Sequence, residues 1–354
     1  MTTAKNDLAI AGRQIGPAQP PYLIAEMSAN HGGSLDRALA VVEAAAQAGA
    51  DAIKLQTYTA DTITINCDRP DFLIKGGLWD GRTLYDLYQE AHTPWEWHRQ
   101  LFAKARELGV TMFSSPFDET AVDFLEELGA LAYKVASFEL VHLPLLRKIA
   151  GTGKPVILST GMASRAEIEE SIGTLRDAGC RELLVLHCTS GYPTPPDEAN
   201  IRMIPHLAEM FDVSVGLSDH TLDNTVAITA VALGAVAIEK HFTLDRGDGG
   251  PDAAFSLEPS EFASLVTTAR TAWAALGKAD GVRAPSEQGN RMFRRSIYAV
   301  QDIKKGDRLT QESVRVIRPG FGLAPRHYDE VLARAASADI ARGTPISWAL
   351  IEQV

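Results

Sequence analysis

Two histidines hold matching places in the sequence. His220 lies in the segment GLSDHT and His241 in IEKHFT, and each follows a short apolar run that is typical of a β-strand. If the two strands are neighbours in a parallel sheet, their imidazoles lie side by side. Two neutral imidazoles with open coordination positions can hold a divalent metal ion, without a sharp choice among Mn, Mg, Zn, Fe and Co. We interpret the pair as candidate metal ligands, although a single histidine would ordinarily be structural.

Two lysines interrupt other apolar runs. Lys54 lies in IKLQ and Lys134 in YKV. An ammonium group that is removed from water needs an anion to offset its desolvation. We therefore expect the lysines to bind a phosphate or a carboxylate, with hydroxyl donors from serines at the ends of nearby runs. These are Ser115, Ser137, Ser159 and Ser218. Two alternatives stay open: a Schiff-base lysine, as in an aldolase, and a pair of ion-paired core lysines.

Three carboxylates are candidates for the rest of the chemistry. Glu26 closes the first apolar run, Glu139 follows the fourth, and Asp252 ends a glycine-rich loop. Glu26 could move protons or activate a water molecule. Two further carboxylates, Asp219 and Glu239, flank the histidines in sequence, and we expect them to orient the imidazoles.

The elements that must position these residues form a repeating pattern. Short apolar runs, expected to be strands buried on both faces, alternate with amphipathic segments expected to be helices. Eight such repeats are the size and order of a (β/α)8 TIM barrel, whose strands end at one mouth where active sites lie. An open doubly wound sheet is the alternative, but no glycine-rich dinucleotide fingerprint follows the first run. The runs are 22–27, 52–58, 110–117, 131–139, 155–162, 183–190, 214–220 and 235–243.

The C-terminal part of the sequence has a different pattern. We expect a barrel domain over residues 1–280 and a linker over 281–289, where Gly, Pro and charged residues gather. Residues 290–354 hold short strand-like pieces at 296–300, 314–317 and 345–351, separated by turns. This part is expected to be a small β-rich domain that docks on another surface.

Composition limits the class of protein. The chain has 354 residues, of which 45% are hydrophobic and 22% are charged, with a net charge of −11. That charge argues against nucleic acid as the main partner. No apolar run approaches the length of a membrane span, and the N-terminus lacks the order of a secretory signal. Three cysteines at unrelated spacings predict a reduced, cytoplasmic protein without disulfides.

The motifs together resemble the sialic acid synthase family, whose members condense phosphoenolpyruvate with an acetamido sugar. The resemblance runs in order through nearly the whole chain. Its C-terminal part, with DIKKG and RPG, is similar to that family's antifreeze-like (SAF) domain. The barrel motifs are AEMSANH, KLQ, YKVASFE, LSTGM, GLSDHT and HFT.

Within the family, several segments resemble the pseudaminic acid synthases, which use 2,4-diacetamido-2,4,6-trideoxy-L-altrose. These segments include LWD, TPWEWH, FSSPF and AAFSL. Other segments, HCTSGYPT and STGM, are more similar to N-acetylneuraminate synthases. N-acetylneuraminate or legionaminate synthesis by the same mechanism therefore stays open as an alternative.

The resemblance also implies roles for individual residues. His220 and His241 would bind a divalent metal, Mn²⁺ in the first place, with Mg²⁺ or Co²⁺ as substitutes. Glu26 would lie near the reacting carbons. Arg318 would reach into the barrel of a partner subunit in a domain-swapped homodimer. Phosphoenolpyruvate would contact Lys54, Ser115, Lys134, Ser137, Ser159 and Ser218, and the sugar would contact Gln56, Glu139, Tyr192 and Asp252.

Overall fold

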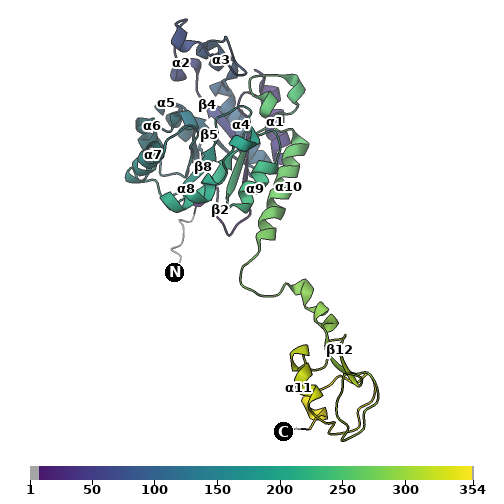
Figure 1. The fold of residues 1–354 in the computed structure, drawn as a ribbon. Helices are drawn as coiled ribbons and strands as arrows, with labels where there is room; N and C mark the ends of the chain where they lie inside the picture. Colours follow the sequence, from purple (N-terminus) through teal and green to yellow (C-terminus); the bar gives the residue numbers. More distant parts are fainter. Residues whose placement is uncertain (1–7, 353–354) are drawn as a thin grey trace. The chain divides into compact units, whose positions relative to one another are not determined.

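The computed structural model describes residues 8–352 and divides the chain into two compact units, Met1–Gly277 and Lys278–Val354 (Figure 1). Each unit has its own hydrophobic core. The segment 281–289, expected to be a linker, lies in the second unit and contains a single turn of 3₁₀ helix at Pro285–Glu287.

The first unit is a closed barrel of eight parallel strands, which confirms the predicted TIM-barrel fold. Consecutive strands pair all the way round, and β10 closes the barrel by pairing with β3. All five residues of β3 are buried, as expected for strands that are covered on both faces. The strands are β3 (Tyr22–Glu26), β4 (Ala52–Thr57), β5 (Thr111–Pro116), β6 (Tyr133–Val135), β7 (Val156–Ser159), β8 (Leu183–Cys188), β9 (Ser214–Ser218) and β10 (Ala237–His241).

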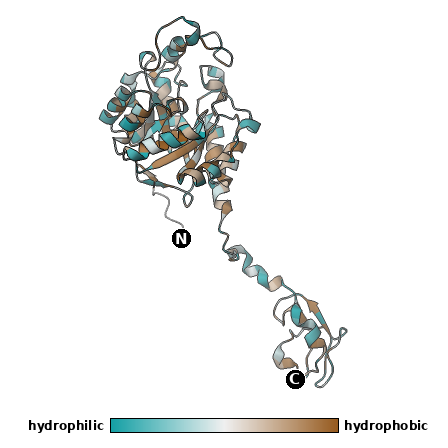
Figure 2. Cartoon of the chain, turned by 60° about the vertical axis from the view of Figure 1, so that its left-hand side comes forward, coloured by the Kyte–Doolittle hydropathy of each residue, from teal (hydrophilic) through white to brown (hydrophobic). Residues whose placement is uncertain are grey.

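Helices surround the barrel, with apolar faces toward the strands and polar faces outward (Figure 2). Local capping sets their ends. Ser164 and Glu167 form the predicted capping box at the start of α7, and α4 ends at Gly109 with φ +70°, where glycine is favoured. The outer helices are α1 (Leu35–Gln47), α4 (Trp95–Leu108), α5 (Glu119–Glu127), α6 (Leu143–Ala150), α7 (Arg165–Asp177), α8 (Met203–Phe211), α9 (Thr225–Ala232) and α10 (Pro259–Leu276).

Four short elements of the first unit were not predicted, two strands and two helices. The hairpin of β1 (Leu8–Ile10) and β2 (Arg13–Ile15) packs its apolar side chains against residues at the starts of the barrel strands, such as Tyr22 and Ala52. It therefore fills the N-terminal end of the barrel. At the other end, α2 (Ala60–Ile63) and α3 (Leu84–Ala91) lie in the long connection between β4 and α4.

The second unit contains the antiparallel pair β11 (Ser296–Ala299) and β12 (Val314–Ile317), followed by α11 (Tyr328–Leu332). These agree with the small β-rich domain predicted there. The prediction of a third strand at 345–351 is wrong. Pro345 and Ile351 form only isolated bridges, and Trp348–Leu350 is a 3₁₀ turn.

Two further predictions concern disulfide bonds and membrane-spanning segments. Cys67, Cys180 and Cys188 are all unpaired. Within residues 8–352, none of the helices combines the length and the apolarity that crossing a membrane requires.

Candidate active site

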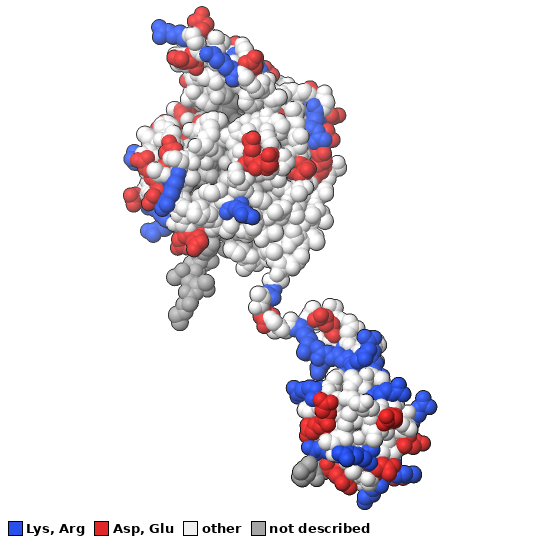
Figure 3. Space-filling model, viewed as in Figure 1, with Lys and Arg blue, Asp and Glu red and all other residues white. Residues whose placement is uncertain are grey.

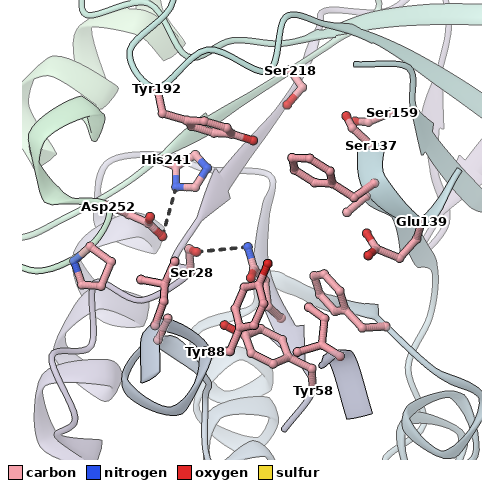
Figure 4. Close-up of a pocket in the computed structure, with 18 of the residues that line it drawn as sticks. Ser28, Tyr58, Tyr88, Ser137, Glu139, Ser159, Tyr192, Ser218, His241 and Asp252 are labelled. Atoms are coloured by element: carbon pink, nitrogen blue, oxygen red, sulfur yellow. Dashed lines mark hydrogen bonds and ion pairs between the residues drawn. The ribbon is translucent and has the colours of Figure 1, made fainter. Parts of the chain in front are cut away.

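A cavity of about 530 Å³ opens at the C-terminal ends of the barrel strands (Figure 4). That volume is in the range of small-molecule sites. Three of the fourteen predicted site residues do not line it: Glu26, Ser115 and Arg318. The eleven that do are Lys54, Gln56, Lys134, Ser137, Glu139, Ser159, Tyr192, Ser218, His220, His241 and Asp252.

The two histidines lie side by side, as the adjacency of β9 and β10 requires. Their ring centroids are 5.4 Å apart, and both side chains are buried. His241 is the last residue of β10, whereas β9 ends at Ser218, so His220 lies in the following loop and not at the end of a strand. His220 Nδ1 lies 3.0 Å from the carbonyl oxygen of Thr189. That contact leaves its other ring nitrogen available for a ligand.

The two imidazoles differ in their electrostatics, because Cys188 and the carbonyl group of Thr189 raise the pKa of His220 despite burial. Burial, together with the neighbouring His220, holds the pKa of His241 well below its usual value, so His241 is neutral. Its Nδ1 atom is buried without a hydrogen-bond partner, with Asp252 Oδ2 at 3.9 Å. Within residues 8–352, no cluster of three or more His, Cys, Asp and Glu side chains is arranged to hold a metal. An ion bound by the two histidines would therefore take its other ligands from water or substrate.

A buried ion pair links the segments that carry the histidines. Lys240 Nζ donates to Asp219 Oδ2 at 2.9 Å and also to the carbonyl oxygens of Thr221 and Asp223, at 2.7 and 2.8 Å. Asp219 was expected to orient an imidazole. Its carboxylate instead accepts from Lys240 and from the backbone N–H of Thr221, which fixes the loop that contains His220.

The two lysines share one carboxylate. Glu239 Oε1 accepts from Lys54 Nζ at 2.8 Å and lies 3.8 Å from Lys134 Nζ. Glu239 therefore belongs to the lysine cluster, whereas we expected it beside the histidines. Burial raises the pKa of Glu239, but Lys134 and Lys54 outweigh burial and lower that pKa to about 2. Glu239 is thus ionised.

Glu26 lies at the edge of this cluster. It is fully buried, with Oε2 at 3.2 Å from Lys54 Nζ and Oε1 accepting from Gln56 Nε2 at 2.9 Å. Burial, reinforced by Glu239, raises the pKa of Glu26 to about 7. Burial also lowers the pKa of Lys134 to about 8. The pKa of Lys54 is raised despite burial, because Glu239 and Glu26 lie beside it. Lys134 is thus the less firmly paired of the two ammonium groups.

Hydroxyl groups are arranged around the lysines. Ser159 Oγ is buried and has no partner, and Ser218 Oγ donates to Glu239 at 3.4 Å. Ser137 Oγ accepts from the backbone N–H of Gly161 at 3.1 Å. A Cβ atom at Gly161 would clash with the hydroxyls of Ser190 and Ser137, so a larger residue there would displace both. Ser115 is fully buried and does not line the cavity, although its hydroxyl also lacks a partner.

Glu139 lies on the side of the cavity that holds Ser137 and Ser159 (Figure 4), and aromatic residues line other parts of the cavity. Glu139 Oε2 is buried without a partner, and burial raises the pKa of Glu139 to about 7. The Tyr192 ring contacts that of His220 in a tilted arrangement, with ring centroids 4.4 Å apart and an interplanar angle of 46°. Figure 4 shows Tyr192, His241 and Asp252 together on one side of the cavity and Glu139 on another.

Several lining residues were missed by sequence reasoning. Ser28 accepts from Gln56 Nε2 at 3.0 Å, and Cys188 Sγ lies 4.0 Å from His220 Nδ1. Most of the others come from residues 58–91. Leu84, Leu87 and Tyr88 have the i, i+3, i+4 spacing of a helix face and lie on α3, whereas Ile63, Ile74 and Trp79 follow no period. That helical spacing, and the resemblance of LWD (78–80) to the pseudaminic acid synthases, are the two sequence signals for this segment.

Arg318 lies in the second unit, directly after β12, and its side chain is exposed. Exposed arginines of the preceding segment accompany it, at positions 291, 294 and 295. The backbone N–H of Gly320 donates to the carbonyl oxygen of Met292 at 2.9 Å, which ties the two segments together.

Comparisons with known proteins agree with this architecture. Residues 41–281 match the NeuB family model and residues 294–352 match the SAF domain model. The chain is 48% identical to a pseudaminic acid synthase of Campylobacter jejuni (strain 81-176), covering 91% of this chain and 94% of that one. It is 42% identical to a pseudaminic acid synthase of Helicobacter pylori, covering 93% and 97%.

A solved structure is also similar over most of its length. It is an N-acetylneuraminic acid synthetase of Leptospira borgpetersenii in complex with citrate, with a TM-score of 0.73 and 31% identity. The match covers 82% of this chain and 96% of that one.

Proposed function

The chain belongs to the NeuB family, and we propose that it condenses phosphoenolpyruvate with 2,4-diacetamido-2,4,6-trideoxy-L-altrose, the reaction of a pseudaminic acid synthase. The products are pseudaminic acid and phosphate. The observation that carries the proposal is one cavity in which a lysine cluster lies beside a pair of buried, adjacent histidines. The lysine cluster suits a ligand that carries a phosphate and a carboxylate, and the histidine pair suits a metal ion that activates a carbonyl group.

Phosphoenolpyruvate is assigned to the lysine side of the cavity. Its phosphate and carboxylate add negative charge next to Lys134, whose ammonium is 3.8 Å from its nearest carboxylate oxygen and is free to approach a ligand. Ser159 offers a buried hydroxyl without a partner. Charge-assisted hydrogen bonds of this kind are the strong ones in proteins. Lys54, Ser137 and Ser218 complete the assignment, and Ser115 could join them only if its surroundings rearrange.

His220 and His241 are assigned as ligands of a divalent metal, with Mn²⁺ proposed as the ion. The unpaired ring nitrogen of neutral His241 fits this role. A divalent ion would supply Lewis-acid activation of a carbonyl oxygen. The ion pair of Lys240 with Asp219 keeps both imidazoles in place.

The reaction joins carbon 3 of phosphoenolpyruvate to the aldehyde carbon of the open-chain sugar. The carbonyl π electrons move to the aldehyde oxygen, which takes up a proton, and a cation develops at carbon 2 of the former enol. Water adds to carbon 2 and loses a proton. The tetrahedral adduct then breaks its carbon–oxygen bond to phosphate while the hydroxyl group on carbon 2 passes its proton to the departing phosphate, which leaves a ketone at carbon 2. Ammonium groups around the leaving phosphate stabilise its charge.

Glu26 is assigned to proton transfer in these steps. Its pKa of about 7 allows it to hold or release a proton near neutral pH. Although Glu26 does not line the cavity, Gln56 connects it to the lining, because Gln56 Nε2 donates to both Glu26 and Ser28. The sugar is assigned to Gln56, Glu139, Tyr192 and Asp252.

A homodimer with exchanged SAF domains is part of the proposal. Residues 278–354 hold 13 Lys and Arg against 9 Asp and Glu, so this unit carries +4 and the remainder of the chain carries −15. Basic side chains gather on the surface of the SAF unit (Figure 3). Opposite charges on the two units favour their association, and Arg318 is the exposed residue that we assign to a partner's cavity. We also assign the reaction to the cytoplasm, because all three cysteines are unpaired.

A panel assay tests the function. The protein is incubated with phosphoenolpyruvate, Mn²⁺ and, in separate reactions, the diacetamido altrose, the legionaminic acid precursor and N-acetylmannosamine. We expect equal amounts of phosphate and a 3-deoxy-nonulosonate, with the altrose as the best substrate, and no turnover in EDTA or in His220→Ala. If another sugar is the best substrate, the assignment of the diacetamido altrose is wrong. The proposed condensation is contradicted if no sugar gives phosphate release, or if borohydride traps pyruvate on a lysine.

A further inference from the structure

One side of the cavity is apolar, and one segment contributes most of it, with the rings of Tyr58 and Phe117 adjoining. Residues 60–91, between β4 and α4, contribute Ile63, Ile74, Trp79, Leu84, Leu87 and Tyr88 to the lining; we call these six residues the apolar wall. Figure 4 shows Tyr88 across the cavity from Ser218, which borders the lysine cluster. The cavity therefore has one charged side and one apolar side.

The apolar wall is held in place. Ile74 and Arg82 face each other across a small hairpin, in which the backbone N–H of Ile74 donates to Arg82 O at 2.9 Å. At its tip, Trp79 Nε1 donates to the carbonyl oxygen of Pro251 at 3.1 Å, next to Asp252. The Trp79 ring also lies 5.9 Å from that of Tyr192. These contacts join the wall to the loops that carry two of the proposed sugar contacts.

The wall offers few hydrogen-bond partners to a ligand. Four of its six side chains are aliphatic, and the indole N–H of Trp79 is already used by Pro251. The Tyr88 hydroxyl is the remaining polar group of the six. A ligand hydroxyl placed against this surface would lose hydrogen bonds to water with little return, whereas a methyl group would gain from burial.

We propose that the apolar wall selects an acetamido sugar whose end distal to the aldehyde is a methyl group and not a hydroxymethyl group. This inference rests on the proposed function, since it concerns the sugar of that reaction. The condensation leaves this end of the sugar unchanged, so the wall acts on selectivity and not on the chemical step. Ile63 and Ile74 are the specificity-determining residues that we would alter first.

The test compares two sugars that differ by one oxygen atom. These are 2,4-diacetamido-2,4,6-trideoxy-L-altrose and its 6-hydroxy analogue, 2,4-diacetamido-2,4-dideoxy-L-altrose, each assayed for phosphate release with saturating phosphoenolpyruvate and Mn²⁺. We expect the unaltered protein to favour the 6-deoxy sugar in kcat/KM by about 10- to 100-fold, the range for one hydroxyl in an apolar pocket. Ile63→Thr and Ile74→Thr should each reduce that ratio by about tenfold, because each adds a hydroxyl to the wall.

Ile65→Thr is the matched control. Ile65 lies in the same segment, but its side chain is 58% exposed and does not line the cavity. In Ile65→Thr, the ratio of kcat/KM between the two sugars and the KM for phosphoenolpyruvate should both stay unchanged. The inference is overturned if the unaltered protein uses both sugars equally well, or if the threonine variants slow both sugars by the same factor. Absence of phosphate release with every sugar would instead overturn the proposed function itself.

Discussion

At the scale of single residues, burial sets the charge of Glu139, and this gives a pH dependence. Its pKa is raised to about 7, mainly by burial, so the carboxyl group stays protonated until the pH approaches neutrality. If the ionised form accepts hydrogen bonds from the sugar, kcat/KM for the sugar should rise about tenfold between about pH 6 and about pH 8. The profile is measured at saturating phosphoenolpyruvate.

Glu139→Gln separates this group from its neighbours. Glu26 and Cys188 also have pKa values near 7, so an inflection alone does not identify its source. Glutamine cannot ionise, and the component of the profile that belongs to Glu139 should vanish while the other components remain. A profile of the variant that overlays the original would show that Glu139 does not control sugar use.

Lys134 is the residue whose removal should weaken phosphoenolpyruvate binding without disturbing the fold. Lys54 Nζ lies 2.8 Å from Glu239 Oε1 in the unaltered protein, so Lys134→Ala should not leave the buried Glu239 without a cation. The loss of one charge-assisted hydrogen bond, about 1.5–3 kcal/mol, corresponds to a KM for phosphoenolpyruvate about 10- to 100-fold higher. Lys148→Ala, which alters a surface lysine of α6, is the control and should leave KM unchanged. An unchanged KM in Lys134→Ala would mean that this lysine is misassigned.

At the scale of elements, the Lys240–Asp219 pair fixes β10 to the loop after β9, and we expect it to matter for stability. Lys240 is fully buried and donates to three oxygens. In Lys240→Met, the Asp219 carboxylate would be left buried without its cation, which costs about 3–5 kcal/mol. Urea unfolding followed by tryptophan fluorescence measures this loss.

The control for that measurement is Lys148→Met, which removes a surface ion pair with Asp123. An exposed pair of this kind contributes at most about 1 kcal/mol. Should Lys240→Met cost no more than the control, the pair would not be what holds the two histidines together.

The sequence predicts the eight strands well because parallel barrel strands are buried on both faces and appear as continuous apolar runs. It predicts their ends less well. The run at 131–139 extends past β6, which ends at Val135, since Ser137–Glu139 forms a 3₁₀ turn. A run of suitable residues does not reveal where the ladder of hydrogen bonds stops.

The candidate site was likewise predicted only in part. Residues at strand tips were predicted to gather at one mouth, and nine of the predicted site residues at such tips line the cavity, together with Tyr192 and Asp252 from loops. The partners within the site were not predictable, because they depend on which side chains of neighbouring strands face the same way. Glu239, for example, pairs in register with Ser218 and extends toward Lys54, although the candidate metal ligand His241 lies only two residues after it in the sequence. The apolar wall was missed because Ile63, Ile74 and Trp79 follow no period, and because the helical spacing of Leu84, Leu87 and Tyr88 does not reveal that this face lines a cavity.

At the scale of the whole molecule, the proposed exchange of SAF domains predicts complementation between two inactive variants. His220→Ala damages the barrel and leaves the SAF domain intact, whereas Arg318→Ala does the reverse. If the SAF domain serves the partner's barrel, a mixed dimer contains one undamaged barrel with one undamaged SAF domain. Random pairing should then restore about a quarter of the sites.

The complementation is measured by mixing the two variants, unfolding and refolding them together, and assaying phosphate release. Each variant refolded alone is the control and should stay inactive. No activity in the mixture would place the SAF domain on its own barrel, or show that the protein does not form the proposed dimer.

The central claim is that one barrel mouth holds a metal at the histidines and phosphoenolpyruvate at the lysines. A crystal structure with both ligands, using anomalous scattering to locate Mn²⁺, measures this directly. We predict an anomalous peak shared by His220 and His241, with the phosphate or carboxylate of phosphoenolpyruvate in contact with Lys54 and Lys134. A peak away from the two imidazoles, or phosphoenolpyruvate bound outside this cavity, would contradict the account.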